Sequence, residues 1–211
     1  MGLRRFGVLA FQGSVQEHQE ALRRLEVEVR PVRRPEDLEG LEGLVLPGGE
    51  STTMRRLLAG GLGDAIRQAH ARGMALFGTC AGLILLASRI VEQAEPGVVP
   101  GGGAEPGPGL GVLDVTVARN GYGRQPASFE APLALHPPLD GGPFPGVFIR
   151  APRIVAVGPQ VRVLATLEGQ PVAVQAGRVM GCAFHPELTG DLRLHRYFVD
   201  VVARSGGPGA G

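Results

Sequence analysis

Short apolar runs alternate with segments of helical spacing in the first part of the chain. Continuous apolar runs, typical of strands buried on both faces, cover residues 6–11, 44–46 and 74–77. Segments that favour helices cover residues 14–26, 51–58, 64–72 and 81–92. Ser14 and Glu17 predict a capping box at the start of the first helix. The alternation predicts βαβ units and a mostly parallel central sheet with helices on both faces.

The second half of the chain has a different pattern, with short β segments and few helices. Residues 95–109 are rich in Gly and Pro, which predicts a surface loop. Predicted strands follow at residues 110–118, 146–149, 153–157, 161–167, 171–176 and 179–184. Thr189 or Asp191 caps a last predicted helix. We therefore expect one α/β domain over residues 1–204 with a β-rich second half, and a flexible tail over residues 205–211.

Composition and charge narrow the class of protein. The chain has 211 residues, 44% of them hydrophobic, and a formal net charge of +1, which suits one folded domain without the positive charge that nucleic-acid binding requires. No apolar segment approaches the ~18 residues of a membrane-spanning helix. The two cysteines, with no export signal, predict reduced thiols rather than a disulfide framework. We expect a soluble cytoplasmic protein that binds neither nucleic acid nor membranes.

The most specific local motif is Gly78-Thr79-Cys80-Ala81-Gly82, between a predicted strand and a predicted helix. A G-x-C-x-G sequence in this context is typical of a nucleophile elbow, a tight turn that projects a reactive side chain at the carboxyl edge of a sheet. Glycine is needed on both sides because larger side chains would collide with neighbouring backbone. The amino end of the following helix favours the thiolate form of the cysteine. The alternative is a small buried apolar residue beside a glycine turn.

A cysteine nucleophile requires a base, and His185 is the histidine best placed to be one. It follows the predicted strand 179–184, and Glu187 lies two residues later, where its carboxylate can orient the imidazole. The alternative for His185 alone is a hydrogen-bonded histidine of the core. The other histidines lie in predicted helices or a Pro-rich loop and are predicted to be on the surface: His18, His70, His136 and His195. The second cysteine, Cys182, lies on a predicted buried strand and is expected to be a core residue.

A third candidate element is the segment Pro47-Gly48-Gly49-Glu50-Ser51-Thr52. Paired glycines at the end of a strand leave backbone N–H groups free to bind an anion, as in an oxyanion hole. Phosphate binding is the alternative. It is disfavoured because the chain contains no Lys, which excludes a Walker A loop, and because no G-x-G-x-x-G follows the first predicted strand.

The order of these motifs, P-G-G-E-S-T, then G-T-C-A-G, then H-P-E, resembles that of class I, triad-type glutamine amidotransferases, whose domain is a flavodoxin-like α/β fold. Further segments resemble the glutaminase subunits of pyridoxal 5'-phosphate synthase, the PdxT/SNO family: LAFQGSVQEH, PGGESTTMRRL, FGTCAGLILLA, Arg119-Asn120 with Gly123-Arg124-Gln125, FIRAP and GCAFHPELT. The resemblance runs over nearly the whole chain.

The resemblance implies hydrolysis of L-glutamine to L-glutamate and ammonia. It assigns Cys80 as the nucleophile, His185 as the general base and acid, and Glu187 as the group that orients the imidazole. The backbone N–H groups of Gly49 and Ala81 match the oxyanion hole. Positions that contact glutamine match Gly49, Glu50, Ser51, Arg119, Ile149 and Arg150.

The resemblance leaves some assignments open. It does not decide which charged group meets the α-carboxylate and which meets the α-ammonium of glutamine, and Arg119 can equally belong to a partner interface. It implies no cofactor and no metal. The implied partner is the β/α-barrel synthase component of pyridoxal 5'-phosphate synthase, in a large hetero-oligomer, which receives the ammonia through a sealed channel.

Two alternative functions remain at this point. The chain can be the glutaminase subunit of another amidotransferase, such as imidazole glycerol phosphate synthase or anthranilate synthase, which the RNxxGRQ and FIRAP segments disfavour. It can also be a non-catalytic binding module, which the intact set of Cys80, His185 and Glu187 disfavours. Building the vitamin ring through imines calls for Lys amines, and this chain has none, so we expect that chemistry on another polypeptide.

Overall fold

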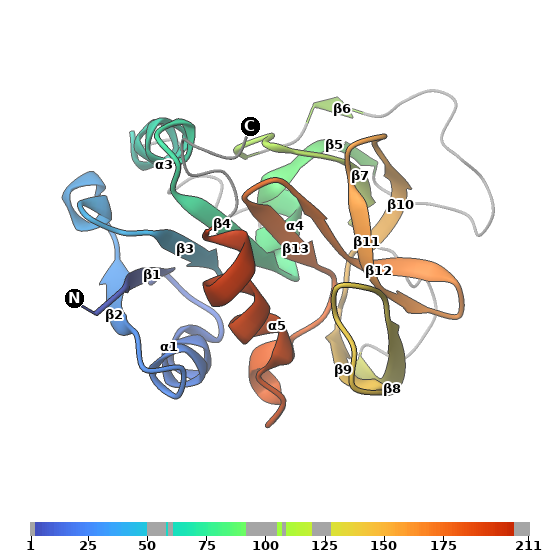
Figure 1. Cartoon of the computed structure of the whole chain (residues 1–211). Coiled ribbons are helices and arrows are strands. Elements are labelled where there is room, and N and C mark those ends of the chain that lie inside the picture. Colours follow the sequence, from blue (N-terminus) through green and yellow to red (C-terminus); the bar gives the residue numbers. More distant parts are fainter. Residues whose placement is uncertain are drawn as a thin grey trace, which may run out of the picture.

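A central sheet of nine strands organises the chain, and a second sheet of four strands packs beside it (Figure 1). The computed structural model describes residues 3–49, 58, 61–91, 105–106, 109–119 and 128–204. The mixed α/β architecture with a β-rich second half agrees with the predicted fold class. None of the helices within these residues has both the length and the apolar character that crossing a membrane demands.

The helices and strands alternate along the first half and give way to strands in the second. The helical elements are α1 (Val15–Arg23), η1 (Pro35–Leu38), α3 (Leu62–Ala71), α4 (Ala81–Leu86), η2 (Pro186–Leu188), α5 (Arg193–Tyr197) and the π-helical turn η3 (Phe198–Val202). The strands of the central sheet are β1 (Arg5–Leu9), β2 (Glu28–Val32), β3 (Gly43–Leu46), β4 (Ala75–Thr79), β8 (Ser128–Leu135), β9 (Phe144–Ile149), β11 (Arg162–Leu167), β12 (Gln170–Ala176) and β13 (Val179–Cys182). The second sheet contains β5 (Ala87–Val91), β6 (Glu105–Pro106), β7 (Leu113–Ala118) and β10 (Arg153–Val157).

The order of the central sheet is β2-β1-β3-β4-β13-β12-β11-β8-β9. The first five strands of this order are parallel, and the rest pair antiparallel. The carboxyl ends of β3, β4 and β13 therefore meet at one edge, because Leu46 pairs with Gly78 and Thr79 pairs with Cys182. A ligand site in a sheet of this kind is expected at that edge.

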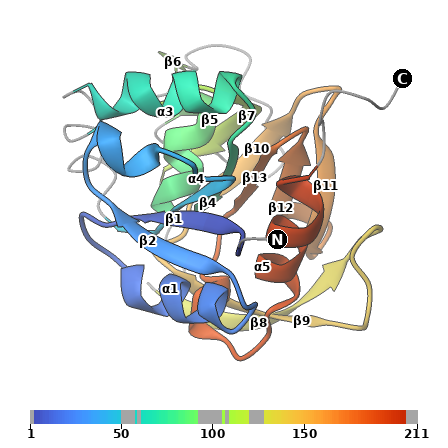
Figure 2. The ribbon, with the colours of Figure 1, turned by 60° about the vertical axis from the view of Figure 1, so that its left-hand side comes forward.

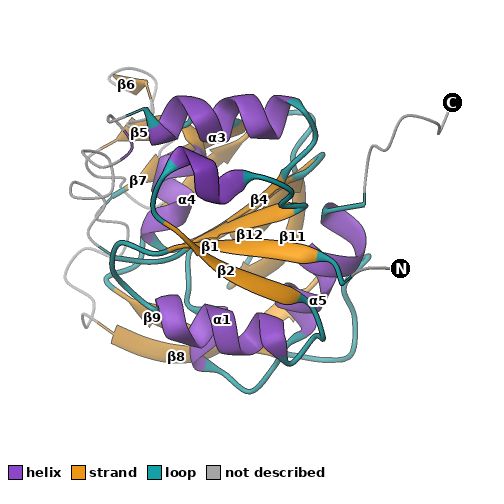
Figure 3. Cartoon of the chain, turned by 90° about the vertical axis from the view of Figure 1, so that its left-hand side faces the viewer, coloured by secondary structure: helices purple, strands orange, loops and turns teal. Residues whose placement is uncertain are grey.

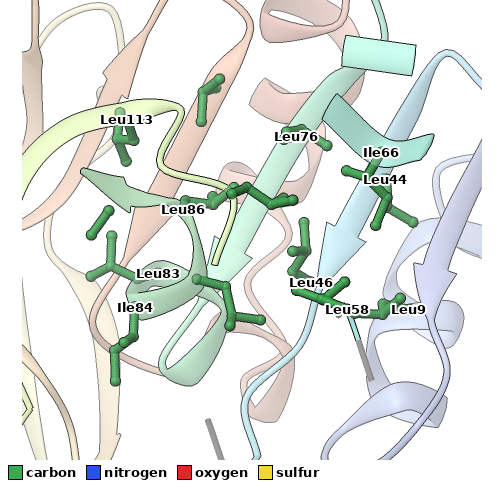
Figure 4. Close-up of a cluster of buried hydrophobic side chains, with 14 of the residues drawn as sticks. Leu9, Leu44, Leu46, Leu58, Ile66, Leu76, Leu83, Ile84, Leu86 and Leu113 are labelled. Carbon is green, nitrogen blue, oxygen red and sulfur yellow. The ribbon is translucent and has the colours of Figure 1, made fainter. Parts of the chain in front are cut away.

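The two faces of the parallel strands bury different helices. Figures 2 and 3 both show α3 on one side of β1 and β2 and α1 on the other. Leu44, Leu46 and Leu76 share a buried cluster with α3, α4 and the second sheet, and Figure 4 shows these side chains gathered there. The intervening residues Val45 and Phe77 belong to the opposite cluster, with α1 and α5. Apolar side chains on both faces explain why the strands are continuous apolar runs.

The predicted helix over residues 81–92 is wrong beyond Leu86. The chain leaves the helix at Ala87, whose φ is −59° and ψ is 139°, and continues as β5. This strand pairs in parallel with β7, and the hydroxyl of Ser88 donates to the carbonyl oxygen of Val115. Pairing with a distant strand outweighs the local helical spacing, which periodicity along the sequence cannot show.

Four other predicted features differ from the structure. The N-cap of α5 is Leu192, not Thr189 or Asp191. The Ser14 side chain makes no capping hydrogen bond, although α1 does begin directly after it. Glu105–Pro106, within the predicted surface loop, forms strand β6. The pattern did not predict β2 and β8, which contain Pro31 and Pro132, a residue that normally argues against a strand interior. The predicted helix over residues 51–58, apart from the helical Leu58, and the predicted tail lie outside the described residues.

Glycine allows α4 to pack against the backbone of β3. A Cβ atom on Gly82 would lie 1.9 Å from the carbonyl oxygen of Leu46, and one on Gly78 would lie 2.6 Å from the carbonyl carbon of Gly82. Both contacts involve backbone atoms within the core, which cannot move aside independently of their elements. The close approach holds the first turn of α4 directly behind the end of β4.

We expect Gly82→Ala to lower the free energy of unfolding by more than about 2 kcal/mol, because the added methyl group has no space beside the backbone of β3. Urea denaturation measures the change. Gly190→Ala is the matched control, since a Cβ atom there meets nothing within 4 Å. It should alter stability by less than about 0.5 kcal/mol. Equal stability of the two variants would contradict the close approach of α4 to β3.

Candidate functional site

Cys80 occupies the turn between β4 and α4 in a strained conformation. Its φ of 50° and ψ of −109° lie in a region that residues with a side chain rarely adopt. The backbone N–H of Cys80 donates to the carbonyl oxygen of Cys182 at 2.9 Å, which ties the turn to the end of β13. The geometry is that of a strand–turn–helix nucleophile elbow, with a cysteine that is only 7% exposed.

The topology brings His185 beside Cys80. His185 follows β13, the neighbour of β4, and its backbone N–H donates to the carbonyl oxygen of Val147 at 2.8 Å. The loop after β3 closes against both residues, because a Cβ atom on Gly48 would lie 2.5 Å from Cε1 of His185 and 3.2 Å from Cβ of Cys80. Three neighbouring strands thus deliver the predicted cysteine, the predicted histidine and the glycine loop to one place.

Glu187 completes a line of hydrogen-bonded groups. Its Oε1 atom lies 2.7 Å from Nδ1 of His185, and its side chain is fully buried in η2. Burial opposes the negative charge, but His18 and the hydrogen-bonded His185 outweigh it and lower the pKa of the Glu187 carboxyl to about 2. The carboxylate is therefore ionised at neutral pH.

The pKa of the His185 imidazole shifts in the opposite direction. Burial by itself lowers its pKa, but hydrogen bonds to Cys80 and Glu187 outweigh burial and raise the pKa to about 10. His185 is therefore protonated at neutral pH, between the Glu187 carboxylate and Cys80. Such an arrangement has the groups that nucleophilic catalysis by a cysteine requires: a thiol, a neighbouring imidazole and a carboxylate that orients the imidazole.

Two buried histidines lie behind this line, where the sequence predicted surface residues. His18 of α1 and His195 of α5 are both 0% exposed. Nδ1 of His18 lies 2.9 Å from Nε2 of His195, and Nε2 of His18 lies 3.0 Å from Oγ1 of Thr79 and 3.3 Å from Oε2 of Glu187. Burial lowers the pKa of His18, and burial with the neighbouring His18 lowers that of His195 to about 3. Both rings are neutral at neutral pH.

The sequence contained a signal for these positions. His18 lies three and four residues before Ala21 and Leu22, which are the other buried residues of α1, so it belongs to the apolar face of that helix. His195 similarly lies three residues before the buried Phe198. The surface prediction also fails for His70 and His136, which are half-buried and bond to the carbonyl oxygen of Met74 and to Oγ1 of Thr166.

The structure describes some of the predicted oxyanion and substrate positions. Gly49 is exposed with a φ of 153°, and Ala81 is the first residue of α4 after Cys80. The Sγ atom of Cys80 lies 3.7 Å from the carbonyl oxygen of Ile149. Arg150 follows with a φ of 43°, a second strained position at this edge.

The remaining predicted substrate positions are Glu50, Ser51 and Arg119. Glu50 and Ser51 lie outside the described residues. Arg119 follows β7, whose last residue, Ala118, pairs with Arg153 at the start of β10. Arg119 therefore lies on the side of the site that the turn after β9 forms.

The loop after β1 packs against the glycine loop that follows β3. The sequence pattern did not predict this contact. A Cβ atom on Gly13 would lie 1.7 Å from the carbonyl oxygen of Gly48, and one on Gly49 would lie 3.2 Å from the side chain of Gln12. Gly13 has a φ of 82°, which only glycine adopts freely. Gly13 thus allows the loop after β1 to contact the loop after β3.

The sequence model of the SNO glutamine amidotransferase family matches residues 8–204 of this chain. The chain belongs to the SNO glutamine amidotransferase family. It is 56% identical over 197 residues to pyridoxal 5'-phosphate synthase subunit PdxT of Deinococcus radiodurans, covering 93% of this chain and 96% of that protein. It is 52% identical to the protein of the same name from Geobacillus thermodenitrificans, covering 94% and 95% of the two chains.

Solved structures agree with this membership of the SNO glutamine amidotransferase family. A crystal structure described as a glutamine amidotransferase superposes with a TM-score of 0.81 at 48% identity, covering 94% of this chain and 98% of that chain. A putative GMP synthase component from Thermoplasma acidophilum superposes with a TM-score of 0.69 at 17% identity, covering 96% of each chain. The second likeness shows a shared fold. The fold is therefore that of the class I glutamine amidotransferases, as the motifs predicted.

The two cysteines of this family member differ in their surroundings. Both are free and buried. Burial and the nearby charge of Glu187 raise the pKa of the Cys182 thiol, which stays protonated and apolar. Cys80 instead lies beside the imidazole of His185. Cys182 is a core residue, as predicted, and serves as an internal comparison for Cys80.

The buried His195 predicts an acid-sensitive stability. Its pKa is lowered from 6.5 to about 3 on folding, so the stabilisation is present above pH 6.5 and is lost as the pH falls toward 3. His195→Gln removes the titration but keeps a donor toward His18. As the pH falls from 6.5 to 4.5, the free energy of unfolding should decrease less steeply in this variant than in the wild type. The two slopes should differ by about 1.4 kcal/mol per pH unit, the contribution of one proton.

Thermal and urea denaturation across this pH range measure the two slopes. Phe198→Leu, at an equally buried and non-titrating position, is the control and should give a curve parallel to that of the wild type. If the His195→Gln curve also runs parallel to the wild type, His195 is not buried as a neutral ring.

Proposed function

We propose that this chain is the glutaminase subunit of pyridoxal 5'-phosphate synthase, which hydrolyses L-glutamine to L-glutamate and supplies the ammonia to a separate synthase subunit. The observation that carries the proposal is the buried line of Cys80, His185 and Glu187 at the carboxyl edge of the parallel strands. The PdxT names of relatives about half identical over nearly the whole chain support the choice of synthase.

The first half of the reaction forms a thioester. The Cys80 thiolate attacks the side-chain amide carbon of glutamine and forms a tetrahedral intermediate whose oxygen carries the negative charge. His185 donates a proton to the amide nitrogen, the carbon–nitrogen bond breaks, and ammonia leaves. The γ-glutamyl group remains on the sulfur.

The second half releases glutamate. Neutral His185 accepts a proton from water, the hydroxide attacks the thioester carbon, and the carbon–sulfur bond breaks to give glutamate and the Cys80 thiolate. Glu187 holds the imidazole through Nδ1 at 2.7 Å, so that Nε2 faces the sulfur in both steps. The carboxylate also stabilises the imidazolium form of His185, which occurs in both halves of the reaction.

The oxyanion and the amino acid need their own partners. The backbone N–H groups of Gly49 and Ala81 are proposed to bind the oxyanion, because both residues flank the Cys80–His185 contact. Gly49, Glu50, Ser51, Arg119, Ile149 and Arg150 are proposed to bind glutamine. An arginine suits the α-carboxylate and an acidic side chain suits the α-ammonium group.

The ammonia needs an acceptor protein in the same compartment as this chain. The synthase partner is proposed to be a β/α barrel in a large hetero-oligomer, and the ammonia to pass through a sealed channel, since free ammonia protonates in water. We propose a cytoplasmic location, supported by the two free cysteines. The family match ends at residue 204, which supports one domain over residues 1–204 and a tail over 205–211.

Purified chain mixed with its synthase partner should release ammonia from glutamine, and Cys80→Ala should abolish that release. A coupled glutamate assay measures the rate. Cys182→Ala is the matched control, since it removes the other buried thiol, and it should keep most of the activity. Undiminished ammonia release by Cys80→Ala would refute the proposed nucleophile. Ammonia release with another acceptor enzyme, but not with the synthase, would refute the proposed pathway.

A further inference from the structure

The hydrogen-bonded line of the site does not end at Glu187. Its two carboxylate oxygens face different elements: Oε1 faces His185 at 2.7 Å, and Oε2 faces His18 of α1 at 3.3 Å. Oε2 is buried and accepts no hydrogen bond of regular geometry from the residues that the structure describes. A buried carboxylate oxygen requires a compensating hydrogen-bond donor, and Nε2 of His18 is the group that lies beside it.

The tautomers of the two buried histidines follow from their surroundings. If Nδ1 of His18 carried the hydrogen, the bare Nε2 lone pair would face the negative Oε2 of Glu187. With the hydrogen on Nε2, His18 instead directs it between Oε2 of Glu187 and Oγ1 of Thr79, at 3.3 and 3.0 Å. Nδ1 then accepts from Nε2–H of His195 at 2.9 Å.

The far end of the chain is consistent with this assignment. Nδ1 of His195 is buried and makes no hydrogen bond among the described residues. In the assigned tautomer this atom is a bare acceptor, which is less costly to leave without a partner than a buried N–H donor is. The line therefore runs His195, His18, Glu187, His185, Cys80, and the ring hydrogens that lie between His195 and Glu187 and between His185 and Glu187 point toward the carboxylate.

We propose that His18 is a positioning residue, which holds the Glu187 carboxylate from behind so that Oε1 faces His185. The inference rests on the proposed function, because it concerns the same nucleophile and base. His18 touches neither the sulfur nor the glutamine. Its effect reaches Cys80 through Glu187 and His185.

The groups that face this contact come from several elements. Glu187 and His185 lie on η2 and at its amino end, Thr79 lies on β4, and His195 lies on α5. Glu17, next to His18 on α1, adds a weaker attraction for a proton on that ring. Burial dominates over these charges, so His18 acts as a neutral donor.

The chain offers a matched pair of substitutions. In His18→Gln the side-chain nitrogen occupies the place of Nε2 and keeps a donor toward Glu187. In His18→Asn the side chain reaches only to the place of Nδ1, so it keeps a partner for His195 and loses the donor toward Glu187. Phe77→Leu is the packing control, because the Phe77 ring contacts the edges of both buried histidines with centroids 6.4 and 5.8 Å away.

The first measurement is the rate of Cys80 alkylation by iodoacetamide against pH, followed by mass spectrometry on the full chain. A less well held carboxylate supports the His185 imidazolium less, so the thiolate forms at higher pH. We expect the acid limb of the His18→Asn profile to move up by about one pH unit. The profiles of His18→Gln and Phe77→Leu should follow the wild type.

The second measurement is glutamine hydrolysis in the complex with the synthase partner. His18→Asn should lower kcat by roughly tenfold, the scale on which groups behind a site act, with KM within about twofold of the wild type. Thermal melting establishes that each variant is folded. His18→Gln should recover most of kcat.

Several results would overturn the role of His18. Alkylation profiles of His18→Asn that coincide with the wild type would do so, and so would equal shifts in His18→Asn and His18→Gln, or an equal shift in Phe77→Leu. Wild-type chain that alkylates as expected but releases no ammonia with the synthase would refute the proposed function alone. The alkylation shift in His18→Asn would then still support the positioning role.

Discussion

β4 pairs in parallel with β3 on one side and with β13 on the other, and these pairings determine where Cys80, His185 and the glycine loop lie. Parallel strands end at the same edge, so the turn at Cys80 receives the glycine loop from one neighbour and His185 from the other. Gly78 and Gly82 let α4 turn back directly behind the strand, at the cost of a strained φ at Cys80. A shift of one residue in the pairing of β4 with β13 would separate the sulfur from the imidazole, and a shift in the pairing of β4 with β3 would displace the glycine loop from both.

The electrostatics of the site depend on a single buried carboxylate. Glu187 is stable as an anion because His185 and His18 face its two oxygens, and a buried charge without such partners would cost several kcal/mol. Burial keeps His18 and His195 neutral, so neither ring adds a full charge beside the Glu187 carboxylate. Despite burial, hydrogen bonds to Cys80 and to this carboxylate then raise the pKa of His185 to about 10.

The β-rich second half forms one wall of the site. The end of β9 brings the carbonyl oxygen of Ile149 to 3.7 Å from the Cys80 sulfur, and Val147 holds the backbone of His185. Stacked Phe129 and Phe148 rings, 4.7 Å apart, join β8 to β9 behind this wall. The second sheet contributes apolar side chains to the cluster that supports α4.

The features that the sequence determined by itself are local ones. The elbow around Cys80 follows from two glycines within five residues, and the pairing of His185 with Glu187 follows from a separation of two residues at the end of a strand. The apolar runs likewise determined four strands of the parallel half of the sheet, β1, β3, β4 and β13, but not β2. Each of these depends on neighbours along the chain, so a pattern of residues is enough to predict it.

Only the tertiary structure decided the features that depend on distant segments. Residues 87–91 form a strand because β7 is there to pair with them, not because of their own spacing. The spacing of His18 along α1 indicates a buried face, but only the packing of α1 and α5 on the same face of the sheet brings His18 to His195 and to Glu187. Burial and charge compensation are properties of an assembled core. The sequence therefore does not show whether a histidine in a helix faces water or a carboxylate from a distant segment.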